Sequence, residues 1–186
     1  MVTWQDKWKL VGGLVAAMWA VEAVNFFFGH ALSRWGIEPR TLSGLVGIPL
    51  APLLHTGPLH LLANTIPALV LGLLVAARGS GDFLRASLFI TVVGGLGVWL
   101  IGSRAYHVGA SGLVFGYFGY LVARGFVERS LSAILIAGAT LFLYGGIVWG
   151  VLPLWRGVSW EGHLAGLLAG ILAARAVRSD AEGEPA

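Results

Sequence analysis

The stretch Gly109-Ala110-Ser111-Gly112 places a serine between small residues at the start of an apolar segment, where a membrane helix rarely needs a hydroxyl group. Much later, the stretch Gly162-His163-Leu164-Ala165-Gly166 opens the last apolar segment with a histidine. A hydroxyl group is a nucleophile once an adjacent base accepts its proton, and a neutral imidazole is such a base. The two stretches together indicate hydrolytic chemistry carried out inside a lipid bilayer.

The composition indicates an integral membrane protein. Of the 186 residues, 57% are hydrophobic and only 11% are charged, whereas a soluble domain carries about 25% charged residues. The chain has no cysteine, which excludes disulfides, thiolate nucleophiles and cysteine-based zinc sites. The formal net charge is +3, but lysine and arginine lie singly between apolar runs. That spacing is typical of topology signals rather than of a phosphate-binding patch, so we expect no nucleic-acid partner.

Apolar runs of the length that crosses a bilayer, about 20 residues, occur along most of the chain. They are residues 10–28, 58–77, 83–102, 110–127, 131–150 and 160–177. Between the first two runs, prolines alternate with leucines and valines, and we expect a long structured loop partly embedded in the membrane. The sequence therefore predicts an all-α membrane protein: a six-helix bundle with a cytoplasmic segment 1–9, a membrane domain 10–178 and a short cytoplasmic tail 179–186.

The basic residues predict the orientation of this bundle. In a six-span topology, eight of the 12 lysines and arginines lie on one side: Lys7, Lys9, Arg78, Arg85, Arg124, Arg129, Arg175 and Arg178. The other four lie on the opposite side: Arg34, Arg40, Arg104 and Arg156. The side richer in basic residues faces the cytoplasm, so both termini are expected there. The short tails suit a multi-pass protein of a prokaryotic inner membrane.

The serine and the histidine have complementary roles in this interpretation. A lone membrane serine most often bonds to the carbonyl four residues earlier, and Ser111 alone leaves that alternative open. Gly109 and Gly112, however, leave room for a substrate carbonyl and free backbone N–H groups at a helix start. His163, as a neutral imidazole, would accept the serine proton. Glu161 lies roughly 200° away around a helix and points elsewhere, so we expect a Ser–His dyad without an acid.

A further polar pair lies on segment 58–77. His60 and Asn64 are four residues apart and share one helix face. An amide is a poor zinc ligand, so we expect no metal here, and two hydrogen-bond donors suit the binding of an oxyanion. The alternative is that the pair only ties helices together. His55 and His107 lie near predicted helix ends and are interpreted as structural.

Several small residues are spaced for close contact between helices. Gly112 and Gly116 lie four apart on the fourth apolar segment, as Gly166 and Gly170 do on the sixth. Small residues let helix backbones approach one another in lipid. Close packing of these two segments would bring the serine and the histidine together. Glu22 and Asn25 are predicted to form hydrogen bonds between helices.

The pattern His55-x4-His60-x3-Asn64, followed by Gly-x-Ser-Gly and His-x-x-Gly, resembles the rhomboid family of intramembrane serine proteases. The resemblance extends over nearly the whole chain. It implies that Ser111 is the nucleophile and that His163 is the general base. It also implies that His60, Asn64 and the backbone N–H of Ser111 bind the oxyanion.

The resemblance implies a substrate class as well. The expected substrates are single-span transmembrane proteins in the lipid bilayer, cleaved near the extracytoplasmic face without a cofactor or a metal. Gly166 would allow close packing of the sixth helix against the fourth. Two positions depart from the family pattern. Phe115 stands where members often carry an aromatic hydroxyl, and residues 29–57 hold no Trp-Arg pair.

Two alternative functions stay open at this point. The first is a non-catalytic rhomboid-like protein that binds membrane clients, although such proteins typically lose the serine or the histidine and this chain keeps both. The second is a small channel or transporter, for which we would expect an inverted repeat. No such repeat is evident in the sequence.

Overall fold

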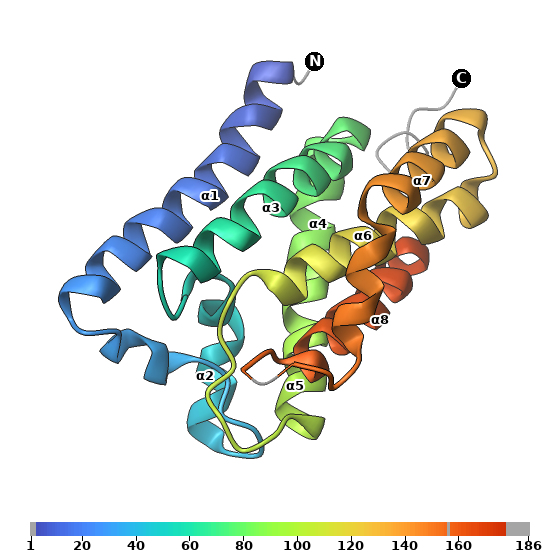
Figure 1. The fold of residues 1–186 in the computed structure, drawn as a ribbon. Coiled ribbons are helices and arrows are strands. Elements are labelled where there is room, and N and C mark those ends of the chain that lie inside the picture. Colours follow the sequence, from blue (N-terminus) through green and yellow to red (C-terminus); the bar gives the residue numbers. More distant parts are fainter. Residues whose placement is uncertain (1–2, 156, 178–186) are drawn as a thin grey trace.

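The chain folds into a bundle of helices (Figure 1), described here from a computed structural model that covers residues 3–155 and 157–177. Within these residues there is no strand, and one isolated antiparallel bridge joins Ile37 to His107. The prediction of an all-α fold is therefore confirmed. Arg156, Arg178 and the predicted tail 179–186 lie outside the described residues.

The helices follow the apolar runs of the sequence. In chain order they are α1 (Trp4–Phe27), η1 (Ala31–Trp35), α2 (Leu42–Leu50), η2 (Ala51–Leu53), α3 (Pro58–Arg78), α4 (Ser80–Phe89), η3 (Ile90–Gly94), α5 (Gly95–Ile101), α6 (Ser111–Glu128), α7 (Leu131–Tyr144), η4 (Gly145–Val151) and α8 (Trp160–Ala176). The turn η3 is π-helical and makes α4 and α5 one continuous helical segment, whereas η1, η2 and η4 are 3₁₀ helices.

Four helical segments among the described residues are long and apolar enough to cross a membrane: Trp4–Phe27, Pro58–Arg78, Ser80–Ile101 and Leu131–Val151. These segments make the chain an integral membrane protein. Helix α8 is shorter, with 17 residues. Helix α6 contacts α3, α4, α7 and α8, and a helix enclosed by protein needs no fully apolar surface of its own. The six-span topology stays a prediction for these two helices.

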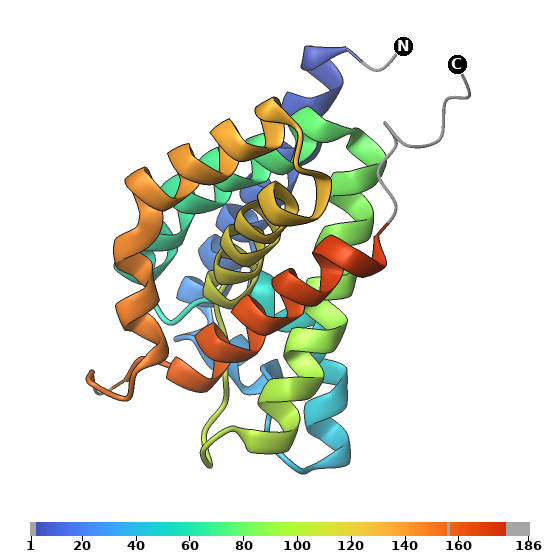
Figure 2. The same ribbon diagram turned by 90° about the vertical axis from the view of Figure 1, so that its right-hand side faces the viewer.

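The two ends of the bundle differ in what they carry. The α3–α4 and α6–α7 turns lie at the end where α1 begins. Helix α2, the α5–α6 loop and the α7–α8 connection lie at the opposite end, which we call the loop end (Figures 1 and 2). The predicted loop 29–57 contains η1, α2 and η2. Its depth in the membrane stays a prediction.

Helices α6 and α8 touch through their backbones. A Cβ atom added to Gly166 would overlap the carbonyl oxygen of Gly112, and one added to Gly170 would overlap that of Gly116. Contact this close is possible only because these residues have no side chain. It places the first turns of the two helices beside each other at the loop end.

A buried ionic cluster joins the helices at the other end. The guanidinium of Arg124 donates to the carbonyl oxygens of Ala174 (3.1 Å) and Val177 (3.4 Å) at the end of α8. It also pairs with Glu128, which pairs in turn with Arg78 on α3. Buried charges are tolerated when they are paired and hydrogen-bonded. This cluster therefore joins α3, α6 and α8.

The glycine contact can be tested by comparing the same substitution on α8, which makes the contact, and on α7, which does not. Gly170→Ala is expected to lower the free energy of unfolding by about 1–3 kcal/mol, because the new methyl group overlaps backbone that cannot move aside. Gly138→Ala on α7 is the matched control, since a Cβ there meets nothing within 4 Å. Unfolding in detergent micelles measures both variants. Equal unfolding of the two would contradict this account of the α6–α8 contact.

Candidate functional site

A cavity of about 620 Å³ lies at the loop end, between α3, the α5–α6 loop, α6 and the α7–α8 connection. The four side chains predicted to act in chemistry all line it, although they come from three different helices: His60, Asn64, Ser111 and His163. His107, interpreted from the sequence as structural, lines the same cavity. The structure thus gathers the predicted site residues in one place.

Ser111 is the first residue of α6, and the backbone before it makes an unusual turn. The N–H groups of a first helical turn have no partner within the helix, so they are available to a ligand. Gly109 has a φ of +115°, a region that favours glycine. A Cβ atom there would lie 2.8 Å from Nε2 of His60. Both the backbone angle and the approach to His60 therefore require glycine at this position.

The ring of His163 is oriented by two groups on either side of it. Its Nδ1 lies 2.8 Å from the carbonyl oxygen of Gly150 in η4. Because a carbonyl oxygen only accepts hydrogen bonds, Nδ1 carries the proton and Nε2 keeps its lone pair. Phe115 stacks on the ring, with the centroids 4.1 Å apart and the planes at 10°. His163 is therefore held in the tautomer that a general base needs.

Ser111 and His163 do not hydrogen-bond to each other in the described structure, although both face the cavity. Catalytic hydrogen bonds are often long or absent before substrate binds and tighten in the complex. The ring of His163 is thus already oriented without a bond to Ser111.

His60 presents a donor to the cavity. Its Nδ1 lies 3.1 Å from the hydroxyl of Thr56 and 3.5 Å from the backbone nitrogen of Thr56. A backbone N–H can only donate, so Nδ1 accepts and the ring proton is on Nε2, on the edge of the ring that approaches Gly109. Asn64 is buried, and its amide donates to the carbonyl of His60 over 2.9 Å. Thr56 was not identified from the sequence: it lies between His55 and His60, but the pattern leaves that position open.

Comparison with known proteins agrees with these motifs. The sequence profile of the rhomboid domain matches residues 43–180. The chain belongs to the rhomboid family. An uncharacterized protein of Mycobacterium tuberculosis is 42% identical over 186 residues, which cover 92% of this chain and 77% of that protein. An uncharacterized protein of Mycobacterium leprae is 39% identical over 183 residues, covering 90% and 72% respectively. Rhomboid proteins are generally intramembrane serine proteases, and the family also includes members without catalytic activity.

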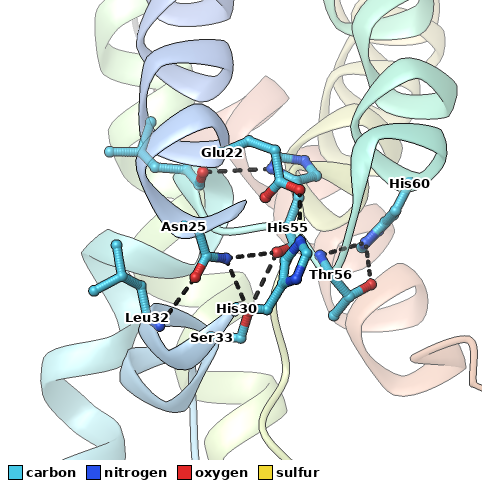
Figure 3. A network of polar contacts seen from close by, with 9 residues as sticks. Glu22, Asn25, His30, Leu32, Ser33, His55, Thr56 and His60 are labelled. Carbon is cyan, nitrogen blue, oxygen red and sulfur yellow. Dashed lines mark hydrogen bonds and ion pairs between the residues drawn. The ribbon is translucent and has the colours of Figure 1, made fainter. Parts of the chain in front are cut away.

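In this rhomboid protein, polar side chains of α1 fix the long loop that follows it (Figure 3). The amide of Asn25 donates to the carbonyl of His55 (2.9 Å) and to the hydroxyl of Ser33 (3.2 Å). Glu22 pairs with His30 over 3.0 Å. Asn25, predicted to bond between helices, does so from α1 to Leu32 and Ser33 of η1, while Glu22 bonds to the residue that precedes η1. They lie near the end of α1, where the chain turns back across the loop end, so they bond to that returning segment.

His55 links this network to the backbone just before Ser111. Its side chain is fully buried, and its Nε2 accepts a hydrogen bond from the backbone N–H of Ala110 over 3.4 Å. Burial, and to a lesser degree the neighbouring His60, lowers the pKa of His55 from 6.5 to about 4. The ring is therefore neutral at pH 7 and free to accept this bond. His55 holds the backbone immediately before Ser111.

The role of Gly150 can be tested without measuring catalysis. In Gly150→Ala the new Cβ would lie 2.8 Å from Cζ of Phe115 and 3.0 Å from Nδ1 of His163. The carbonyl must then shift, and the preference of His163 for the Nδ1–H tautomer is expected to weaken. Nitrogen-15 NMR of histidine-labelled protein reads this tautomer directly.

The matched control is Gly146→Ala in the same 3₁₀ helix, where a Cβ meets nothing within 4 Å. It should leave the spectrum of His163 unchanged. The His163 resonance is assigned by its loss in His163→Ala. An unaltered tautomer in Gly150→Ala would show that another group orients the ring.

Proposed function

We propose that this rhomboid protein is an intramembrane serine endopeptidase, with Ser111 as the nucleophile and His163 as the general base. The observation that carries the proposal is the single cavity that receives four groups of complementary chemistry. They are a hydroxyl group at a helix start, an imidazole with a free Nε2, and two hydrogen-bond donors on α3. Membership of the rhomboid family supports the same reaction class.

The reaction would proceed by acyl transfer. Oγ of Ser111 attacks the carbonyl carbon of the substrate peptide while Nε2 of His163 takes its proton. The negative charge that develops on the carbonyl oxygen is stabilised by Nε2–H of His60, the Asn64 amide and the N–H of Ser111. His163 then gives the proton to the leaving amine. In the second half, His163 removes a proton from water, which attacks the acyl carbon; as the acyl–Oγ bond breaks, His163 returns that proton to Oγ of Ser111.

Gly150 and Phe115 take the place of the acid that many serine hydrolases use. When His163 is protonated, its positive charge lies between the carbonyl dipole of Gly150 and the face of Phe115. A carbonyl oxygen accepting from N–H and an aromatic face each stabilise a cation. Neither carries a net charge that must itself be desolvated.

The substrates we propose are single-span membrane proteins, cut near the extracytoplasmic surface. Hydrolysis needs water, and the cavity lies at the loop end, where the chain leaves the helices. The proposed topology has six spans, both termini in the cytoplasm, and the loop end facing outward across a bacterial inner membrane. Carbonyl groups within a helix are already hydrogen-bonded, so the substrate segment must unwind before Ser111 can attack it.

The decisive experiment uses a fluorophosphonate probe, which reacts with activated serines. We expect the purified protein to be labelled and to cleave a single-span reporter in proteoliposomes. Ser111→Ala should abolish both activities, and His163→Ala should lower both by several orders of magnitude. The control Ser43→Ala, at an exposed serine of α2, should behave like the wild type. Labelling that persists in Ser111→Ala would show that another serine reacts with the probe and contradict the assignment of Ser111, and absence of labelling in folded wild-type protein would favour a non-catalytic client-binding rhomboid.

The oxyanion assignment has its own prediction. Asn64→Ala is expected to lower kcat about 10-fold or more with little change in KM, because the lost donor acts mainly on the transition state. His60→Ala should have a similar effect. Cleavage kinetics in proteoliposomes provide the measurement. Full activity in both variants would show that the oxyanion is bound elsewhere.

A further inference from the structure

We infer that His107 and Ser159 form a clamp that sets the separation between Ser111 and His163. The inference rests on the proposed function, because it assigns positioning roles to two residues outside the proposed dyad. The clamp is a side-chain hydrogen bond between the α5–α6 loop and the residue that caps α8. Each partner precedes one member of the dyad by four residues.

The protons of this hydrogen bond can be placed from its neighbours. Nε2 of His107 lies 3.0 Å from the carbonyl oxygen of Ser103, so Nε2 carries the ring proton. Nδ1 is therefore an acceptor, and the hydroxyl of Ser159 donates to it over 2.6 Å. The same hydroxyl oxygen accepts the N–H of Gly162 over 3.1 Å, which makes Ser159 the N-cap of α8. A cap alone would need only this second bond.

The imidazole end of the clamp is held rigidly. The backbone of His107 exchanges two hydrogen bonds with Ile37, of 2.9 and 3.0 Å. The ring is buried, and a Cβ atom on Gly102 would lie only 2.8 Å from its Nε2. Both ring nitrogens are hydrogen-bonded, which holds the ring in its orientation. It provides a fixed point in the loop that leads into Ser111.

The other end of the clamp leads directly to the base. The backbone N–H of His163 donates to the carbonyl of Ser159 over 3.1 Å. A second bond runs parallel to the clamp, from the N–H of Ser103 to the buried carboxylate of Glu161, over 3.0 Å. The first turn of α8 is thus tied to the α5–α6 loop at two points.

This turn needs such support because the chain before it is exposed. Leu154, Trp155 and Val158 precede α8 with large exposed side chains, and helix ends with few packing contacts open most easily. The glycine contact with α6 fixes the distance between the two helices. The clamp fixes where the first turn of α8, and with it the His163 ring, lies relative to the start of α6.

The test compares two serines that both cap a helix. Ser159→Ala removes a cap and the clamp. Ser130→Ala removes only a cap, since Ser130 caps α7 by accepting the N–H of Ala133 over 3.2 Å. We expect Ser159→Ala to lower kcat and the rate of fluorophosphonate labelling of Ser111 about 10- to 100-fold, the effect of a misplacement near 1 Å. KM should change little, and Ser130→Ala should keep the wild-type rates.

Two further variants separate positioning from folding. Ser159→Thr retains a hydroxyl group and is expected to restore most of the rate. His107→Phe removes the acceptor and should reduce kcat as Ser159→Ala does. The double variant should be no slower than the slower single one, since both remove the same bond. Rates are expressed per folded protein, with the unfolding temperature of each variant measured in parallel.

The outcomes distinguish this inference from the proposed function. If the wild-type protein is labelled but kcat is undiminished in Ser159→Ala or in His107→Phe, the clamp is overturned and the proposed function stands. Equal losses in Ser159→Ala and Ser130→Ala do so as well, because they would reflect capping. A folded wild type that is never labelled overturns the proposed function, and the clamp with it.

Discussion

The structure depends on the direct backbone contact between α6 and α8. At Gly166 and Gly170 no side chain separates the helix from the carbonyl oxygens of Gly112 and Gly116. Within lipid there is no hydrophobic force between helices, so close packing of this kind holds them together. The contact begins one residue after Ser111 and includes the turn that follows His163. The proposed dyad is therefore a consequence of how two helices approach, rather than of a loop folding over them.

A second constraint is the free-energy cost of leaving a polar group unpaired in an apolar interior. Clusters of paired polar residues accordingly lie at the two ends of the bundle. At one end Arg124, Glu128 and Arg78 pair with one another and with the end of α8. At the loop end Asn25 and His55 bind the returning backbone. The fully buried Tyr117 between them shares a hydrogen bond of 2.6 Å with Ser87. Water and substrate would meet the polar groups of the loop end, where the cavity lies.

The sequence predicted what depends on residue type and spacing. Apolar runs of about 20 residues located the helices, and glycines four apart located the α6–α8 contact. The motifs around His60, Ser111 and His163 identified residues that the structure brings to one cavity. The partners of these residues could not be predicted. Gly150 acts through its backbone carbonyl, which every residue has, and Thr56 and Ser159 occupy positions that no sequence motif specifies. The individual partners of Asn25 could not be predicted either, since they depend on where the chain passes after the end of α1.

Within the part of the chain that the structure describes, no carboxylate hydrogen-bonds to His163, and the same physics accounts for this. A carboxylate within this pocket would lose its hydration, and that loss costs free energy unless other groups hydrogen-bond to the carboxylate. The nearest acid in sequence, Glu161, is buried and already accepts the N–H of Ser103. A carbonyl dipole and an aromatic ring orient the imidazole and accommodate its positive charge without adding a second charge to the site. A base oriented by the carbonyl of η4 also depends on where the end of α7 lies, since η4 continues that helix. The orientation of the proposed base and the packing of the least buried of the four candidate spans are therefore physically linked.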